Sequence, residues 1–112
     1  MTQVRPLREI LAEVPDPRAD GGKRHEFEAI LLLVCVAMLS GCENPNQIAA
    51  WGAGQDREYL RLLGFKRGRS IRKSALYELI GQIDVADLEV RLMMWVESVL
   101  LEKKELARKE VA

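Results

Sequence analysis

Hydrophobic positions along the chain repeat with the spacing of amphipathic helices, except in one segment that is apolar almost throughout. Residues 27–39 read FEAILLLVCVAML, with Glu28 as their only charged side chain and no glycine or proline. This segment is too short to cross a bilayer, which takes about 20 apolar residues. Because Ser40-Gly41 follows as a plausible helix stop, the segment predicts a central helix that its neighbours bury on most sides.

The segments around the central helix place apolar residues at the three- and four-residue spacing of one helical face. They predict helices over 6–14, from Asn44-Pro45 to a break at Gly52-Ala53-Gly54, from Asp56 to about Leu63, over 71–82, and from Asp84 past residue 105. The expected N-caps are Asn44, Asp56, Ser70 and Asp84, and Gly64 is expected to end the fourth helix, whose apolar contacts are Tyr59, Leu60, Leu62 and Leu63.

These segments predict an all-α fold, a compact bundle of about five to six helices around the buried central helix. We expect residues 1–101 to form one helical domain and residues 102–112 to form a charged helical tail or the start of a linker. Pro6 suits the first turn of the first helix.

Charge changes this picture in one region. The 112-residue chain is neutral, with 17 basic and 17 acidic residues, which argues against a protein that binds nucleic acid over its whole surface. Residues 57–78 nevertheless carry seven basic side chains and two acidic ones. Such a cluster is either the electrostatic footprint of a nucleic-acid site or a solvated loop.

The order of helices around this cluster is helix-turn-helix-like: a buried supporting helix, a short helix with Gln47-Ile48-Ala49-Ala50, and a later helix with a basic outer side. An extra helix and a long loop between them depart from a simple helix-turn-helix. The alternative is an ordinary amphipathic helix with solvated charges. The candidate DNA-binding residues are Lys66, Arg67, Arg69, Arg72, Lys73 and Tyr77.

A second basic group precedes the central helix, where cations oppose the helix dipole. Its members are Arg18, Lys23, Arg24 and His25, the sole histidine. They either pair with Asp16 or Asp20, which we favour, or contact an anion. For His25 we expect a structural hydrogen bond.

Catalytic and metal chemistry find little support. The chain has no phosphate-binding glycine loop, no dinucleotide fingerprint and no zinc-protease motif. Cys35 and Cys42 with a single histidine do not make a zinc site, and Cys35 is expected to be a buried free thiol. We therefore predict no catalytic residues, no metal and no cofactor. The absence of a signal peptide and the two reduced cysteines predict a cytoplasmic protein with no membrane association.

Several residues together resemble one protein family. They are Asp16-Pro17-Arg18, Gly22, Arg24-His25 before the apolar helix, Gly41, Ile48-x-x-Trp51, Leu60, Gly64, Ile83-Asp84 and Leu88 through Trp95. Over about residues 7–98 this pattern is similar to the N-terminal domain of bacterial insertion-sequence transposases of the H-repeat type. One departure is that Ile71, Arg72 and Ala75 stand where the family usually carries Pro-Ser-x-x-Thr.

In that family the domain precedes a DDE catalytic domain, which is expected beyond residue 112, so no catalytic residue carries over. The resemblance implies a non-catalytic accessory domain in DNA transposition that recognises transposon-end DNA or assembles the complex. The alternative is a protein-interaction or dimerisation module of a truncated or domesticated transposase fragment. Its motivation is the seam of Leu88, Leu92, Trp95 and Val99 on the last helix. Expected partners are thus DNA, a DDE catalytic domain, or a second copy of the chain.

Overall fold

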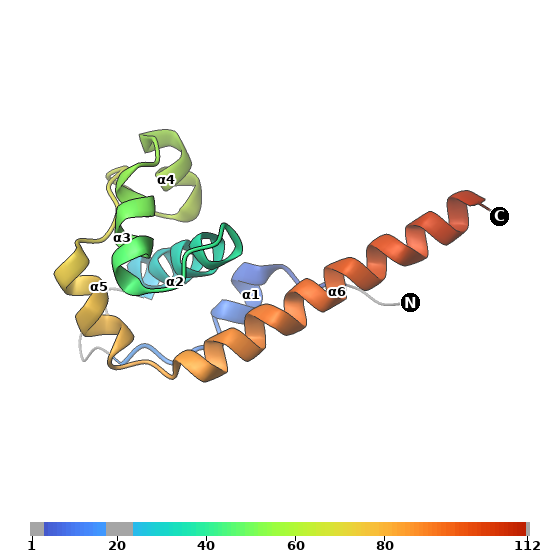
Figure 1. The fold of residues 1–112 in the computed structure, drawn as a ribbon, viewed down its shortest axis with the longest axis horizontal. Coiled ribbons are helices and arrows are strands. Elements are labelled where there is room, and N and C mark those ends of the chain that lie inside the picture. The colour runs from blue at the N-terminus through green and yellow to red at the C-terminus, as the bar shows by residue number, and fades with distance from the viewer. Residues whose placement is uncertain (1–3, 18–23, 112) are drawn as a thin grey trace. The chain divides into compact units, whose positions relative to one another are not determined.

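The computed structural model describes residues 4–17 and 24–111, and all regular structure in these ranges is helical. The described residues contain no strand, so the predicted all-α fold with six helical segments is confirmed. The helices, coloured along the chain in Figure 1, are α1 (Leu7–Leu11), α2 (Arg24–Leu39), α3 (Pro45–Ala53), α4 (Arg57–Leu63), α5 (Lys73–Ile80) and α6 (Val85–Val111).

The helices divide into two units. Residues 15–84 form one unit, which contains α2 to α5, and residues 1–14 and 85–112 form the other, which contains α1 and α6. The domain boundary expected after residue 101 stays a prediction, and α6 runs through that point as one helix to Val111.

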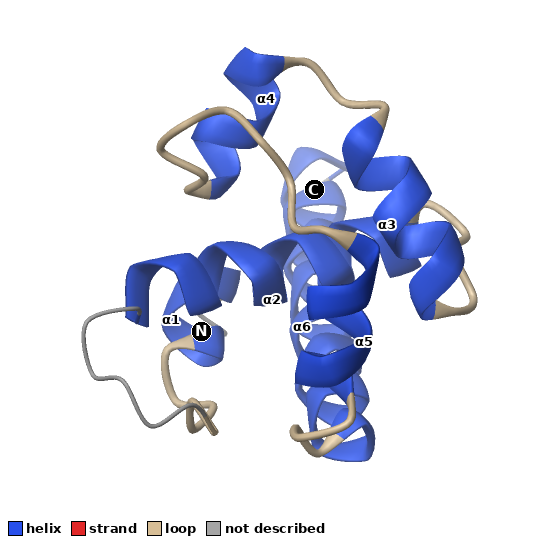
Figure 2. Ribbon diagram, turned by 90° about the vertical axis from the view of Figure 1, so that its left-hand side faces the viewer, coloured by secondary structure: helices blue, strands red, loops and turns tan. Residues whose placement is uncertain are grey.

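The apolar segment forms α2, the central helix of the α2–α5 unit. Phe27, Leu31, Leu33 and Cys35 are fully buried there. Helices α3 and α4 pack against α2, and α5 packs against α3 (Figure 2). The predicted buried central helix is therefore confirmed. Truncating a buried leucine of this kind typically costs about 2–5 kcal/mol, because it removes apolar contacts and leaves a cavity.

The helix ends in this unit follow local side-chain chemistry. Asn44 Oδ1 accepts a hydrogen bond from the Gln47 backbone N–H at 2.9 Å, and Asp56 Oδ1 accepts one from the Tyr59 N–H at 2.7 Å. Each cap satisfies an N–H that has no partner within its helix. At the other end of α4, Gly64 takes a left-handed conformation with φ 119°, which only glycine adopts without strain. Both predicted caps and the predicted helix end are confirmed.

Four details of the predicted helices are wrong. Ser70 does not cap α5, which begins at Lys73 after Arg72. The first helix ends at Leu11 rather than residue 14, and Pro6 is its N-cap residue rather than part of its first turn. Leu62, expected to make apolar contacts, is 72% exposed. Apolar spacing alone does not fix these details: Val14 is buried although it lies beyond the end of α1, and the side of α4 that carries Leu62 faces solvent.

In the unit of α1 and α6, the short helix packs on the long one. Leu7, Leu11, Leu88 and Leu92 are buried. Arg91 joins the two helices, because its guanidinium donates to Asp87 Oδ2 on α6 at 2.9 Å and to Glu13 Oε2 after α1 at 3.4 Å. Glu13 also accepts a hydrogen bond from Arg5, which is the first cause of the lowered pKa of the Glu13 carboxyl.

Helix α6 is far longer than the helix it packs on. Its 27 residues extend about 40 Å, against five residues in α1. Even so, none of the helices in the described ranges has the length and apolar character that a membrane crossing requires.

Candidate nucleic-acid interface

An open cleft of about 610 Å³ lies within the α2–α5 unit, where α3, the start of α4 and the chain leading into α5 meet. Its floor on α3 is made of small side chains, Ala49, Ala50 and Ala53. These alanines leave space that larger residues would fill. The other lining residues are Asn46, Gln55, Arg57, Leu60 and Gly68 to Lys73.

The loop between α4 and α5 packs against the neighbouring helices at three points, which are Phe65, Gly68 and Ser70. Phe65 is buried, and its N–H donates to the Leu60 carbonyl at 3.0 Å. Gly68 has φ +67° and lies so close to α4 that a Cβ there would be 3.0 Å from the Arg57 Cβ. Because the loop approaches α4 this closely, it brings Arg57 to the same cleft as Arg69.

The last fixed point before α5 is Ser70, which lies against Gly52 of α3. A Cβ at Gly52 would be 3.2 Å from the Ser70 Cβ and 3.3 Å from the Leu33 Cδ2, tighter than ordinary contacts. The hydroxyl of Ser70 is buried and has no hydrogen-bond partner among the described residues. This packing explains why Ser70 fails to cap α5, since its side chain turns toward α3.

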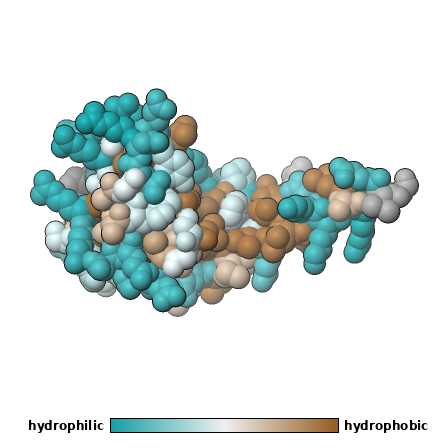
Figure 3. All heavy atoms as spheres, turned by 45° about the horizontal axis from the view of Figure 1, so that its top comes forward, coloured by the Kyte–Doolittle hydropathy of each residue, from teal (hydrophilic) through white to brown (hydrophobic). Residues whose placement is uncertain are grey.

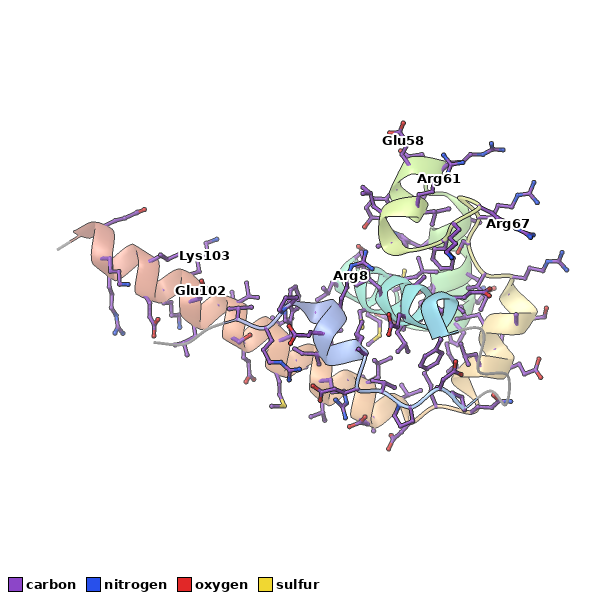
Figure 4. The ribbon with its side chains drawn as sticks, turned by 180° about the vertical axis from the view of Figure 1, so that it is seen from behind. Arg8, Glu58, Arg61, Arg67, Glu102 and Lys103 are labelled. Atoms are coloured by element: carbon purple, nitrogen blue, oxygen red, sulfur yellow. The ribbon has the colours of Figure 1, made fainter. Side chains whose placement is uncertain are left out.

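Basic side chains occupy the exposed positions between these fixed points. Arg57, Arg69, Arg72 and Lys73 line the cleft, and none of its described lining residues is acidic. Lys66 and Arg67 are exposed on the preceding loop. Arg61 and Arg67 project outward from α4 and from the loop after it (Figure 4). None of these seven cations forms an ion pair with another described residue, so within that part of the chain the protein does not neutralise them.

The N-terminus of α5 adds partial positive charge beside the same cations. Arg72 occupies the N-cap position, and its side chain makes no capping hydrogen bond. The first N–H groups of a helix have no partner within the helix and are well placed to hold an anion. Guanidinium groups and free backbone N–H groups together are the donors that phosphate oxygens accept from.

The structure thus brings together three of the six predicted DNA-binding residues, Arg69, Arg72 and Lys73, in the cleft lining. Lys66 and Arg67 are exposed before it, and Tyr77 lies on α5, one turn after Lys73 and 47% exposed. Their role in binding stays a prediction. Arg57 belongs to the basic cluster of residues 57–78 but is not among the six residues predicted to bind DNA. The signal that selects it is the tight approach of Gly68 to α4, which a linear pattern does not show.

The second basic group lies largely outside the described residues. Arg18, Lys23 and Asp20 fall in the range that the structure does not describe, and so do the side chains of Arg24 and His25 at the start of α2. The expected pairing or anion contact of this group stays a prediction.

The remaining chemistry-bearing side chains are placed as structural groups. Cys35 is a free thiol whose burial raises its pKa to about 12, so it stays protonated at neutral pH. Cys42 is also free and half-buried. Across residues 4–17 and 24–111, no three His, Cys, Asp or Glu side chains group together as metal ligands.

The geometry thus defines an all-helical domain with a basic cleft. Residues 8–96 match the family model described as DDE_Tnp_1-associated. Because the match spans most of the chain, the protein belongs to this family of DDE-transposase-associated domains, and the resemblance drawn from the sequence is confirmed. The family is a non-catalytic part of DDE transposases. No curated protein and no solved structure matches the chain.

Proposed function

We propose that this domain is a non-catalytic accessory part of an insertion-sequence transposase and binds transposon-end DNA through the cleft between α3 and α5. The observation that carries the proposal is the set of four cleft cations, Arg57, Arg69, Arg72 and Lys73, which have no acidic neighbour in the lining and no ion-pair partner among the described residues. A cation that the protein leaves unpaired is available to a phosphate.

In this proposal each of the four cleft cations neutralises one phosphate of the DNA backbone, and the first turns of α5 lie in the major groove, where their side chains also reach the bases. Arg57 and Arg69 contact phosphates from two sides of the cleft, and Lys66 and Arg67 extend the contact along the strand. Arg72, Lys73 and Tyr77 are exposed on or beside the first turns of α5. Arginine pairs well with guanine edges in the major groove, and a recognition helix places its N-terminal residues there. Packing of α5 on α3 supports a helix-turn-helix-like arrangement.

The expectation that the domain prefers transposon-end DNA rests on the family to which the chain belongs. A domain carried by DDE transposases serves a reaction in which the enzyme must find its own ends. The cleft itself explains backbone binding, and base contacts from α5 would supply the discrimination.

The test is fluorescence-anisotropy binding of the purified chain to a labelled duplex taken from the flanks of its own gene, beside a scrambled duplex of equal length and base composition, over a salt series. We expect salt-sensitive binding with a preference for the flanking DNA. Equal binding to both duplexes would retain the phosphate contacts and refute end recognition. No binding at low salt would refute the DNA proposal and leave protein interaction as the domain's role.

A further inference from the structure

Helix α6 carries an apolar strip that its own unit leaves uncovered. Met93 and Leu100 are each 53% exposed, and Val96 between them is half-buried. Their spacing of three and four residues places them on one side of the helix. Figure 3 shows apolar side chains gathered along this helix. Val99 and the 54% exposed Leu106 continue the apolar side chains further around the helix, on the far side of the exposed Lys103.

The length of α6 explains why α1 leaves this strip exposed. The five residues of α1 cover only part of a helix of 27 residues, and the strip continues the seam that begins at the buried Leu88 and Leu92. Past α1, the second half of α6 extends with no other described element of its unit beside it (Figure 1).

One edge of the strip carries two isolated charges of opposite sign. Glu97 and Lys104 are seven residues apart, two turns of helix, and therefore lie on the same edge. Neither has a residue of opposite charge three or four positions away on α6, where a helical ion pair forms. Neither forms an ion pair with any other described residue.

We propose that α6 is a self-association surface, on which the strip of a second copy of this chain packs in antiparallel orientation. A two-fold axis that crosses the helix pair between Leu100 and Leu101 places Glu97 of one copy beside Lys104 of the other. The symmetry repeats the pair, because in a two-fold interface each contact occurs twice. The apolar strips then cover each other while both isolated charges find partners.

A parallel pair does not give this match. In a parallel pair the two-fold axis runs along the helices, so the edge that carries Glu97 and Lys104 lies on the opposite side of the interface from the same edge of the second copy, and these two charges do not meet. The charge pattern therefore selects the antiparallel orientation. Because the strip covers only residues 93–106, about 20 Å of helix, we expect a weak dimer with a dissociation constant of about 10–100 µM.

Sedimentation velocity of the intact chain from 10 µM to 1 mM, without DNA, tests the proposal. Each of the variants Glu97→Lys and Lys104→Glu places like charges together twice and should weaken the dimer about tenfold. An equimolar mixture of the two variants should restore association, because lysine and glutamate then face each other at both positions. Leu100→Glu should leave only monomer.

Two variants serve as matched controls. Glu58→Lys changes the net charge as Glu97→Lys does, but on the exposed surface of α4. Lys109→Glu changes it as Lys104→Glu does, but points about 140° away around α6. Both should associate like the parent, and circular dichroism at low concentration should show equal helix content in all variants.

The outcomes separate the proposal from its competitors. Monomer alone up to 1 mM would overturn the second copy as occupant and leave the catalytic part of a transposase as the partner to test. Association that the two charge reversals do not weaken, or that their mixture does not restore, would overturn the antiparallel pairing. None of these readouts involves DNA, so the result is independent of the proposed DNA binding.

Discussion

Removal of three cleft cations should change the salt dependence of DNA binding by a calculable amount. The perturbation is the triple variant Arg69→Ala, Arg72→Ala, Lys73→Ala. Log affinity falls linearly with log salt, with a slope of about −0.9 for each phosphate that the protein neutralises. Four cations line the cleft. If each neutralises one phosphate, the parent slope is about −3.6 and the slope of the variant, which keeps only Arg57, is about −0.9.

These slopes predict very different behaviour over an ordinary salt range. Between 50 and 200 mM salt the parent should lose about 150-fold in affinity, and the triple variant only about 3.5-fold. The exposed cations outside the cleft, Lys66 and Arg67, steepen both slopes equally if they also contact phosphate. The difference of about 2.7 between the two slopes is therefore the quantity that tests the cleft.

The assay is fluorescence anisotropy at five salt concentrations with one labelled duplex. The matched control is the triple variant Lys103→Ala, Arg108→Ala, Lys109→Ala, which removes three charges from α6 and leaves the cleft intact. Its slope should equal that of the parent. If the two triple variants have equal slopes, the DNA lies elsewhere and the assignment of the cleft is refuted.

Three further predictions concern the stability of the fold. Gly52→Ala adds a Cβ against Ser70 and Leu33, and the cost of this overpacking should exceed the gain in helix propensity. Urea unfolding should therefore show a free energy of unfolding about 1 kcal/mol lower than that of the parent. An unchanged free energy of unfolding would mean that Ser70 moves freely. Asp56→Ala removes the cap of α4 and should cost about 1 kcal/mol in the same assay, with Asp56→Asn as the conservative control. Glu13 has a pKa below its ordinary 4.5, so its stabilising contribution is present above that value and should disappear as the pH falls through the lowered pKa; Glu13→Gln should flatten this acid limb, and an acid limb identical to the parent's would contradict it.

The sequence predicted correctly those helices and helix ends that depend on residues close together in the chain. The central helix α2 follows from the absence of polar residues over 27–39, because such a segment must be covered on most sides. The caps at Asn44 and Asp56 follow from side chains that reach an N–H three residues ahead. The end of α4 follows from the left-handed conformation that Gly64 tolerates.

The errors arose where a distant segment competes for a side chain. Ser70 stands at a plausible cap position, but the missing side chain of Gly52 in α3 makes room for it, and packing there wins over capping. The helix that Ser70 was expected to cap consequently begins later, at Lys73. The same limit applies to the site: the basic cluster is visible as a run of residues, whereas the approach of Arg57 to that run depends on how closely Gly68 packs on α4.

The neutrality of the chain bears on how a basic cleft finds its DNA. Residues 57–78 carry seven basic and two acidic side chains, a net charge of +5, so the other residues together carry −5. A uniformly basic protein of this size binds DNA in many orientations, since any face attracts phosphate. If the cleft binds DNA as proposed, the surplus acidic residues elsewhere repel the duplex, while the cleft cations, which form no ion pair with another described residue, attract it. In that case approach from other faces is disfavoured, and the charge distribution would orient α5 toward the DNA before any base is contacted. A change of Glu58 to lysine, which extends the basic region onto α4, should accordingly raise binding to scrambled DNA more than binding to flanking DNA.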